Sequence, residues 1–170
     1  MTKSETFSYF SYGSNMLTAR LLERTPSAVV VKTGHIKHRR LTFNKVSVDG
    51  SGKCDIEQTD KETDLIYGVI FKISISEKQA LGKAEGVGKG YEEHTLDVET
   101  PEGAEQAITY IATRKEHLLR PYHWYKALVV CGAIEHKLPT NYIEWIRTIC
   151  SKEDLDSERR AKNEAIIFGS

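Results

Sequence analysis

The stretch Phe7–Met16 constrains the fold more than any other part of this chain. From Phe7 to Tyr12, aromatic residues are interspersed with serines, a pattern typical of a strand with two different faces. Gly13, Ser14 and Asn15 then favour a turn or a helix cap, and the helix-like run Leu17–Arg24 follows directly. A strand, a small-residue loop and a helix N-terminus in succession leave backbone N–H groups open to a carboxylate or an oxyanion.

The remaining segments predict further strands and then helices. β-branched or alternating residues predict strands at 28–33, 40–46, 54–59 and 65–75, and a hairpin formed by 91–99 and 106–113. Ser76 is the expected N-cap of a short helix that ends at Gly86. Two more helices are expected to open at Pro121 and at Pro139. This order predicts an α+β fold rather than a repeated βαβ unit.

The bulk composition suggests one domain over residues 1–170, with 151–170 as a charged C-terminal helix or tail. The 24 basic and 24 acidic residues cancel, so nucleic acid and membranes are not expected as partners. Three widely spaced cysteines indicate reduced thiols. No apolar run is long enough to span a membrane, so we expect no membrane anchor. Segment 1–5 is short and polar, so we expect no signal peptide and a cytoplasmic location. Trp124 and Trp145 fit either the core or a homodimer interface.

Glu85 is the carboxylate that the local pattern singles out. It would lie in the last turn of the helix that Gly86 ends, next to the negative end of the helix dipole. That end disfavours the charged form of a carboxylate, which suits a general base. The same placement also fits an ordinary surface glutamate at a frayed helix end.

Three other types of site have little support in the sequence. Ser14 as a nucleophile would need a histidine base, and no Gly-x-Ser-x-Gly elbow is present. The six histidines are scattered without a metal-ligand spacing, so we expect no metal. The glycines of 86–90 follow a helix and precede a strand, which is the reverse of a phosphate-binding loop.

Three blocks of the chain, taken together, resemble the γ-glutamylcyclotransferase family. Tyr9-Phe10-Ser11-Tyr12-Gly13-Ser14-Asn15-Met16 resembles its opening motif, and Glu85-Gly86-Val87 is similar to its catalytic glutamate segment. Pro121–Lys126, Cys131–Ala133 and Leu138–Tyr142 resemble its C-terminal block. The blocks occur in the family's order and cover residues 7–146.

The resemblance implies a small mixed β-barrel flanked by helices, with the active site at the barrel mouth. It also implies a cofactor-free reaction on a small-molecule γ-glutamyl substrate: the α-amine attacks the γ-carbonyl, and 5-oxoproline and a free amine result. Glu85 would be the general acid/base. The substrate-binding residues carried over are Tyr9, Phe10, Ser11, Tyr12, Gly13, Ser14, Asn15 and Tyr125.

Two alternatives to the cyclotransferase stay open at this point. One is a non-catalytic barrel that binds a small molecule or a protein, and the other is a hydrolase that acts through Ser14. Within the family, the Tyr-Gly-Ser-Asn sequence resembles the branch that acts on γ-glutamyl amino acids rather than the relatives that degrade glutathione. The identity of the released amine is not indicated.

Overall fold

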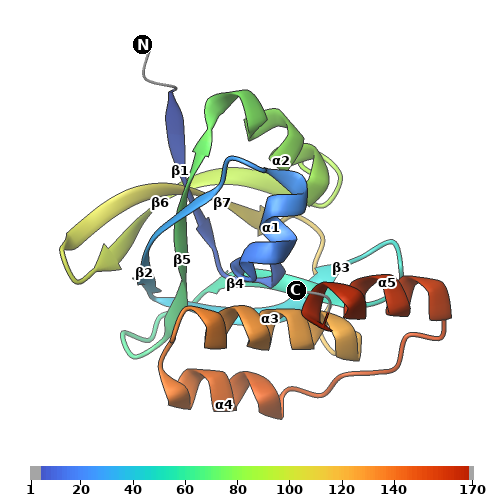
Figure 1. Ribbon diagram of the computed structural model, residues 1–170. Helices are drawn as coiled ribbons and strands as arrows, with labels where there is room; N and C mark the ends of the chain where they lie inside the picture. Colours follow the sequence, from blue (N-terminus) through green and yellow to red (C-terminus); the bar gives the residue numbers. More distant parts are fainter. Residues whose placement is uncertain (1–4, 169–170) are drawn as a thin grey trace.

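The computed structural model describes residues 5–168 (Figure 1), so most of the polar segment 1–5 and the last two residues of the 151–170 tail lie outside the described residues. Its centre is a closed barrel of five strands in the order β1-β5-β2-β6-β7. The strands are β1 (Thr6–Ser11), β2 (Val29–Lys37), β5 (Leu65–Ser74), β6 (Tyr91–Thr100) and β7 (Gly103–Ala112). β1 runs antiparallel to β5 but parallel to β7, where Tyr9 lies opposite Ile108 and closes the barrel. The prediction of an α+β fold with a mixed barrel is confirmed.

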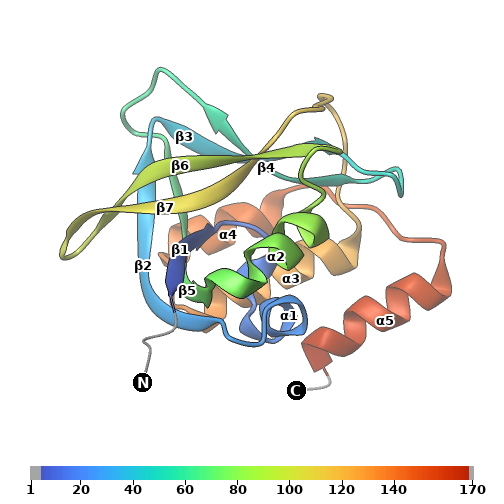
Figure 2. The ribbon, with the colours of Figure 1, turned by 90° about the horizontal axis from the view of Figure 1, so that it is seen from above.

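A second, two-stranded sheet lies beside the barrel and consists of β3 (Arg39–Val46) and β4 (Gly52–Gln58). It is joined to the segment after β7, because the amide of Val46 donates to the Arg114 carbonyl (3.0 Å) and that of Gly52 to the Arg120 carbonyl (3.0 Å). Figure 2 shows this sheet next to the long β6–β7 hairpin. The predicted strands and the hairpin are therefore all present, although β2 continues through Gly34 to Lys37.

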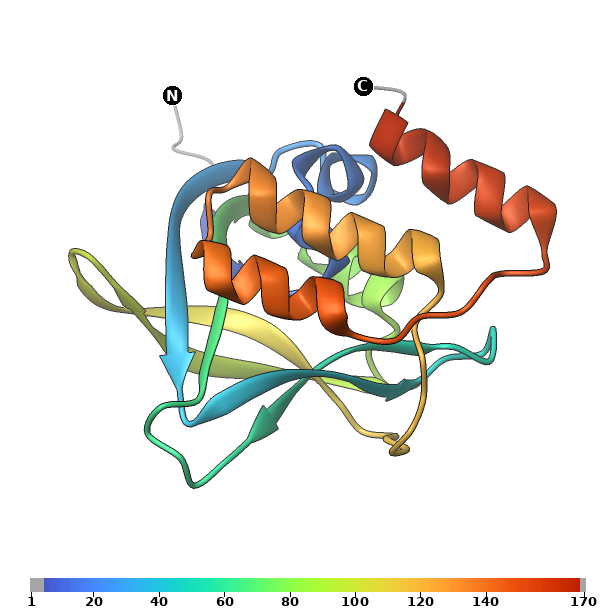
Figure 3. The same cartoon turned by 90° about the horizontal axis from the view of Figure 1, so that it is seen from below.

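The helices lie on two sides of the barrel. α1 (Thr18–Arg24) and α2 (Lys78–Glu85) each follow a 3-10 turn, η1 (Ser14–Met16) and η2 (Ile75–Glu77). On another side, α3 (His123–Glu135) and α4 (Thr140–Thr148) lie next to each other, as Figure 3 shows, and α5 (Ser157–Phe168) also contacts α3. Among the described residues, no helix is both long enough and apolar enough to cross a bilayer.

Two predicted helix starts are wrong. Ser76 is not an N-cap, because it lies inside the 3-10 turn that precedes α2, where the Lys78 amide donates to the Ile75 carbonyl. Pro121 is not a first helical residue, because its carbonyl accepts a hydrogen bond from Lys152 (2.9 Å), which keeps this segment extended until His123. Gly86 does end α2 as predicted: its φ of 76° is the left-handed conformation that glycine adopts most easily.

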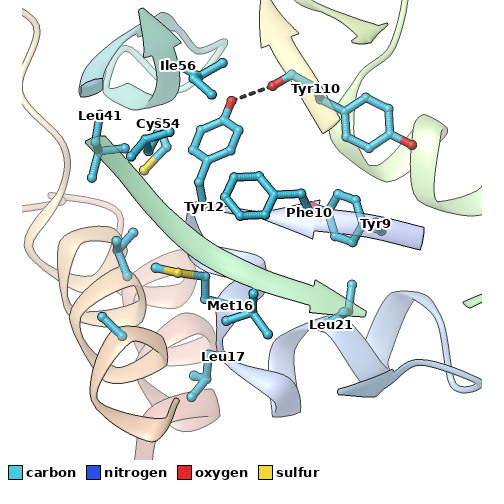
Figure 4. Close-up of a cluster of buried hydrophobic side chains, with 14 of the residues drawn as sticks. Tyr9, Phe10, Tyr12, Met16, Leu17, Leu21, Leu41, Cys54, Ile56 and Tyr110 are labelled. Carbon is cyan, nitrogen blue, oxygen red and sulfur yellow. Dashed lines mark hydrogen bonds between the residues drawn. The ribbon is translucent and has the colours of Figure 1, made fainter. Parts of the chain in front are cut away.

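One continuous core joins the barrel to the helices, and Figure 4 shows the part around the opening stretch. Met16 and Leu17 lie against α3, where Gly132 permits a close approach: a Cβ there would be 2.6 Å from the Leu17 amide nitrogen. Trp124 is buried in this core, whereas Trp145 is 43% exposed. The homodimer stays a prediction.

The charged C-terminal segment is helical and packs only lightly. α5 has no fully buried residue. Ile166 and Ile167 pack against the core, but Phe168 is 80% exposed. Residues 157–168 of this segment therefore form a surface helix, which was one of the two sequence alternatives.

Candidate active site

The loop between β1 and α1 presents unused amide groups. The amides of Met16 and Leu17 donate to the carbonyls of Gly13 (3.1 Å) and Ser14 (3.3 Å) within the 3-10 turn η1. Within residues 5–168, the amides of Gly13, Ser14 and Asn15 donate to no other group. The predicted open N–H groups are therefore present, but on the loop and a 3-10 turn rather than at the start of an α-helix. Such groups can bind a carboxylate or an oxyanion.

Glu85 reaches this loop from the C-terminus of α2. Its Oε1 accepts a hydrogen bond from the side-chain amide of Asn15 and lies 3.1 Å from Nη1 of Arg24. The same Arg24 nitrogen donates to Oδ1 of Asn15 (3.0 Å), and Asn15 also donates to the hydroxyl of Tyr9 (3.2 Å). From the sequence we expected only an unfavourable helix end next to this carboxylate. The structure adds a cation and an amide donor that stabilise its negative charge and hold it in place.

A cavity of about 310 Å³, partly open to solvent, lies between the loop and Glu85. Its walls are mostly aromatic and hydroxylic, and come from β1, the loop, β4, α2, β6, β7 and α3. The lining residues are Tyr9, Ser11, Tyr12, Gly13, Ser14, Asn15, Cys54, Glu85, Tyr91, Tyr110 and Tyr125. Eight of the nine residues proposed from the sequence are therefore brought together in one cavity.

Phe10 is the exception among the proposed site residues. Its side chain is fully buried and does not line the cavity. The ring packs over Gly68 of β5 so closely that a Cβ on this glycine would be 2.6 Å from it. Phe10 is thus a core residue that supports the strand (Figure 4).

The tyrosines of the cavity are neutral hydrogen-bonding groups. Burial raises the pKa of Tyr9, Tyr12, Tyr91 and Tyr125. Tyr12 donates to the backbone carbonyl of Tyr110, as the dashed line in Figure 4 marks. These hydroxyls therefore keep their protons and do not serve as bases.

Tyr125 and Tyr91 bind the two backbone groups of Cys54. The Cys54 amide donates to the hydroxyl of Tyr125 (3.0 Å), and Tyr91 donates to the Cys54 carbonyl (2.6 Å). The hydroxyl of Tyr125 also interacts with the side chain of Cys54, and Tyr125 lines the cavity. Burial raises the pKa of the Cys54 thiol to about 12, so it is not a nucleophile at neutral pH.

Ser14 lacks the partners of a catalytic serine. Its hydroxyl accepts a hydrogen bond from Nε of Arg20 (3.1 Å), which cannot act as a base at neutral pH. No histidine lines the cavity among residues 5–168. The same described residues contain no group of acidic, histidine or cysteine side chains that could hold a metal. The hydrolase alternative therefore has no structural support.

Comparisons with known proteins give the family. The chain is 34% identical over 154 residues to the "Gamma-glutamylcyclotransferase" of Mus musculus, covering 86% of this chain and 80% of that protein. The Homo sapiens protein of the same name is 34% identical over 152 residues, covering 85% of this chain and 79% of that protein. This chain belongs to the gamma-glutamylcyclotransferase family. A model described as the AIG2-like family also matches residues 65–146.

A solved gamma-glutamyl cyclotransferase structure agrees with this assignment. It superposes with a TM-score of 0.87 at 31% identity, covering 98% of this chain and all of that chain. The fold of the gamma-glutamylcyclotransferase family is thereby confirmed for this chain. Membership also makes it an enzyme of this type rather than the non-catalytic binding barrel.

Sequence reasoning missed several residues of this gamma-glutamylcyclotransferase cavity. Tyr110 lines it from β7 and Cys54 from β4, and no local pattern marked either of them. Arg24, the cation on Glu85, carried a weak signal, because Arg20 and Arg24 are four residues apart and so share one face of α1.

Proposed function

We propose that this enzyme converts a γ-glutamyl amino acid or amine to 5-oxoproline and the free amine. The α-amine of the substrate attacks its own γ-carbonyl carbon, so a C–N bond forms while the original amide C–N bond breaks. Glu85 accepts a proton from the α-ammonium and delivers it to the departing nitrogen. The second proton, which the attacking nitrogen loses as the lactam forms, ends on the same leaving group, which departs as an ammonium. Atoms and protons balance without a cofactor or a nucleophilic side chain.

A single juxtaposition carries this proposal: the Glu85 carboxylate shares one cavity with the free amides of Gly13–Asn15. A base and an oxyanion site are the two groups that an intramolecular aminolysis needs. Each loop amide that donates to the oxyanion would contribute about 3 kcal/mol to the transition state. A cavity that holds the glutamyl chain folded adds the advantage of an intramolecular reaction.

The side chains around the cavity suit the rest of the γ-glutamyl group. The ammonium would be drawn to Glu85 at the negative end of α2. Neutral hydroxyls, including that of Tyr125, would donate to the substrate carboxylate or carbonyl. Ser14, held by Arg20, serves as a binding group rather than as a nucleophile.

The direct test is to incubate the protein with γ-glutamyl-alanine and to identify the products. The proposal predicts equal amounts of 5-oxoproline and alanine. Free glutamate in place of 5-oxoproline would point to hydrolysis and overturn the cyclisation. Absence of turnover across a panel of γ-glutamyl amino acids and amines would overturn the proposed substrate class.

A further inference from the structure

A basic cavity adjoins the active site. It measures about 470 Å³, part of it open to solvent, and shares the Glu85 and Tyr125 walls with the first cavity. Four cations line it: Arg20 and Arg24 from α1, Lys45 from β3 and Lys53 from β4. Because both cavities border Glu85, a group released from the first cavity next to this carboxylate can occupy the second.

Two of the four cations have carboxylate partners. Arg24 pairs with Glu85 at 3.1 Å, and Lys53 pairs with Asp49 at 3.0 Å. The ammonium of Lys53 also lies 4.5 Å from the ring centre of Tyr125, which holds it against the wall of the active site. The charges of these two pairs cancel.

The other two cations, Arg20 and Lys45, form no ion pair within residues 5–168. Arg20 donates to neutral oxygens only, those of Ser14 and Asn163, both at 3.1 Å. Lys45 lies over the ring of Tyr91, with its Nζ 4.9 Å from the ring centre. Four cations and two carboxylates, Glu85 and Asp49, leave this cavity with a net charge of +2.

Both of these cations are partly buried, so the absence of a carboxylate in direct contact with either of them is unfavourable. Burial and the neighbouring Arg24 lower the pKa of Arg20 to about 10, and burial lowers the pKa of Lys45. Arg20 is therefore still a cation near neutral pH. An anion bound between Arg20 and Lys45 would relieve the penalty.

We propose that this cavity binds the released residue of the substrate and that this residue is itself acidic. The preferred substrates are then γ-glutamyl-glutamate and γ-glutamyl-aspartate, whose leaving residue carries two carboxylates, one for Arg20 and one for Lys45. Such a dipeptide has three carboxylates and one ammonium at neutral pH, so its charge complements that of the cavity. A γ-glutamylamine, which lacks both carboxylates on the leaving group, fits least well. The inference rests on the proposed function and narrows its substrate class.

The test compares γ-glutamyl-glutamate with γ-glutamyl-glutamine, which has nearly the same shape but one charge fewer. We expect kcat/KM to be at least about tenfold higher for the glutamate substrate, since charge-assisted hydrogen bonds are the stronger ones. Lys45→Met should reduce this ratio to about two or less. The control Lys32→Met should keep the wild-type ratio, because Lys32 pairs with Glu102 and Glu105 on the β6–β7 hairpin, outside both cavities.

The outcomes separate this inference from the function on which it rests. Equal kcat/KM for both substrates, with 5-oxoproline formed from each, would overturn the acidic preference and leave the cyclotransferase intact. A preference that survives Lys45→Met and also Arg20→Met would overturn the assignment of these two cations. Absence of 5-oxoproline from either substrate and from γ-glutamyl-alanine would overturn the proposed function itself.

Discussion

The side-chain amide of Asn15 donates a hydrogen bond to the carboxylate of Glu85, which lies 70 residues further along the chain. This contact joins the loop after β1 to the C-terminus of α2. It is reinforced by Arg24, which bonds to both side chains. The candidate base and the amides expected to bind the oxyanion are thus positioned by one shared set of contacts.

Glu85→Gln should abolish turnover and leave the fold intact. Glutamine has the same shape and can still accept from Asn15 and Arg24, but it cannot take up a proton at neutral pH. Loss of a general acid/base costs about 10²–10⁴ in rate. Formation of 5-oxoproline measures the loss, and circular dichroism and Tm check the fold. Glu23→Gln on the exposed side of α1 is the matched control; near-normal activity of Glu85→Gln would contradict the mechanism.

Asn15→Ala should lower kcat while Glu85 is still present. Removing one neutral donor to a charged acceptor costs about 1.5–3 kcal/mol, which corresponds to about a 10- to 150-fold loss of rate. Steady-state kinetics measure it, with Asn141→Ala on the exposed side of α4 as the control. A full rate in Asn15→Ala would show that the contact with Glu85 has no catalytic role.

Ser14→Ala should retain measurable activity. The substitution removes the hydroxyl that accepts from Arg20 but leaves the backbone amide of the loop in place. We expect kcat/KM to fall by about tenfold or less, whereas removal of a true serine nucleophile costs about 10⁶. Complete loss of turnover with unchanged substrate binding would instead support a hydrolase that uses Ser14 as its nucleophile.

Gly132→Ala should destabilise the protein, because the new Cβ would lie 2.6 Å from the Leu17 amide and 2.7 Å from the Met16 Cβ. Overpacking of this kind costs about 1–3 kcal/mol, which thermal unfolding can detect. Gly82→Ala is the matched control within a helix: its Cβ would meet Val87 at an ordinary 3.5 Å. Since alanine favours a helix by about 0.5–1 kcal/mol over glycine, this variant should have a higher Tm. Equal effects of the two substitutions would show that α3 does not approach the loop so closely.

Cys150 should react with iodoacetamide in the native protein, whereas Cys54 should not. Cys150 is exposed, whereas Cys54 is buried and its thiol, with a pKa raised to about 12, stays protonated up to that pH. Since the thiolate is the reactive form, we expect labelling of Cys150 and an unlabelled Cys54 at pH 8. Peptide mapping by mass spectrometry identifies which cysteines are labelled. As a control, denaturation should make all three cysteines reactive. Rapid labelling of native Cys54 would show that the barrel mouth opens.

The elements of this protein could be predicted largely because their signals are local. Residue alternation predicted the β6–β7 hairpin, and a glycine at the right place predicted the end of α2. The two wrong helix starts have different causes. At Ser76 an irregular 3-10 turn precedes the helix, and at Pro121 a hydrogen bond to a distant residue delays the start of the helix. That distant residue is Lys152, which no local pattern identifies.

The sequence by itself determined that a strand and a small-residue loop lead into a helix, and that Glu85 ends another helix before a glycine. The three motif blocks also indicated the family, because those residues occur together in its members. Only the tertiary structure decided which side chains meet. In the closed barrel, Tyr110 contacts Tyr12, 98 residues away, and the side chain of Phe10 is buried in the core. The packing of α1 next to α2 places Arg24 3.1 Å from Glu85. Such contacts depend on how the strands pair and how the helices pack, and residue spacing along the chain does not contain that information.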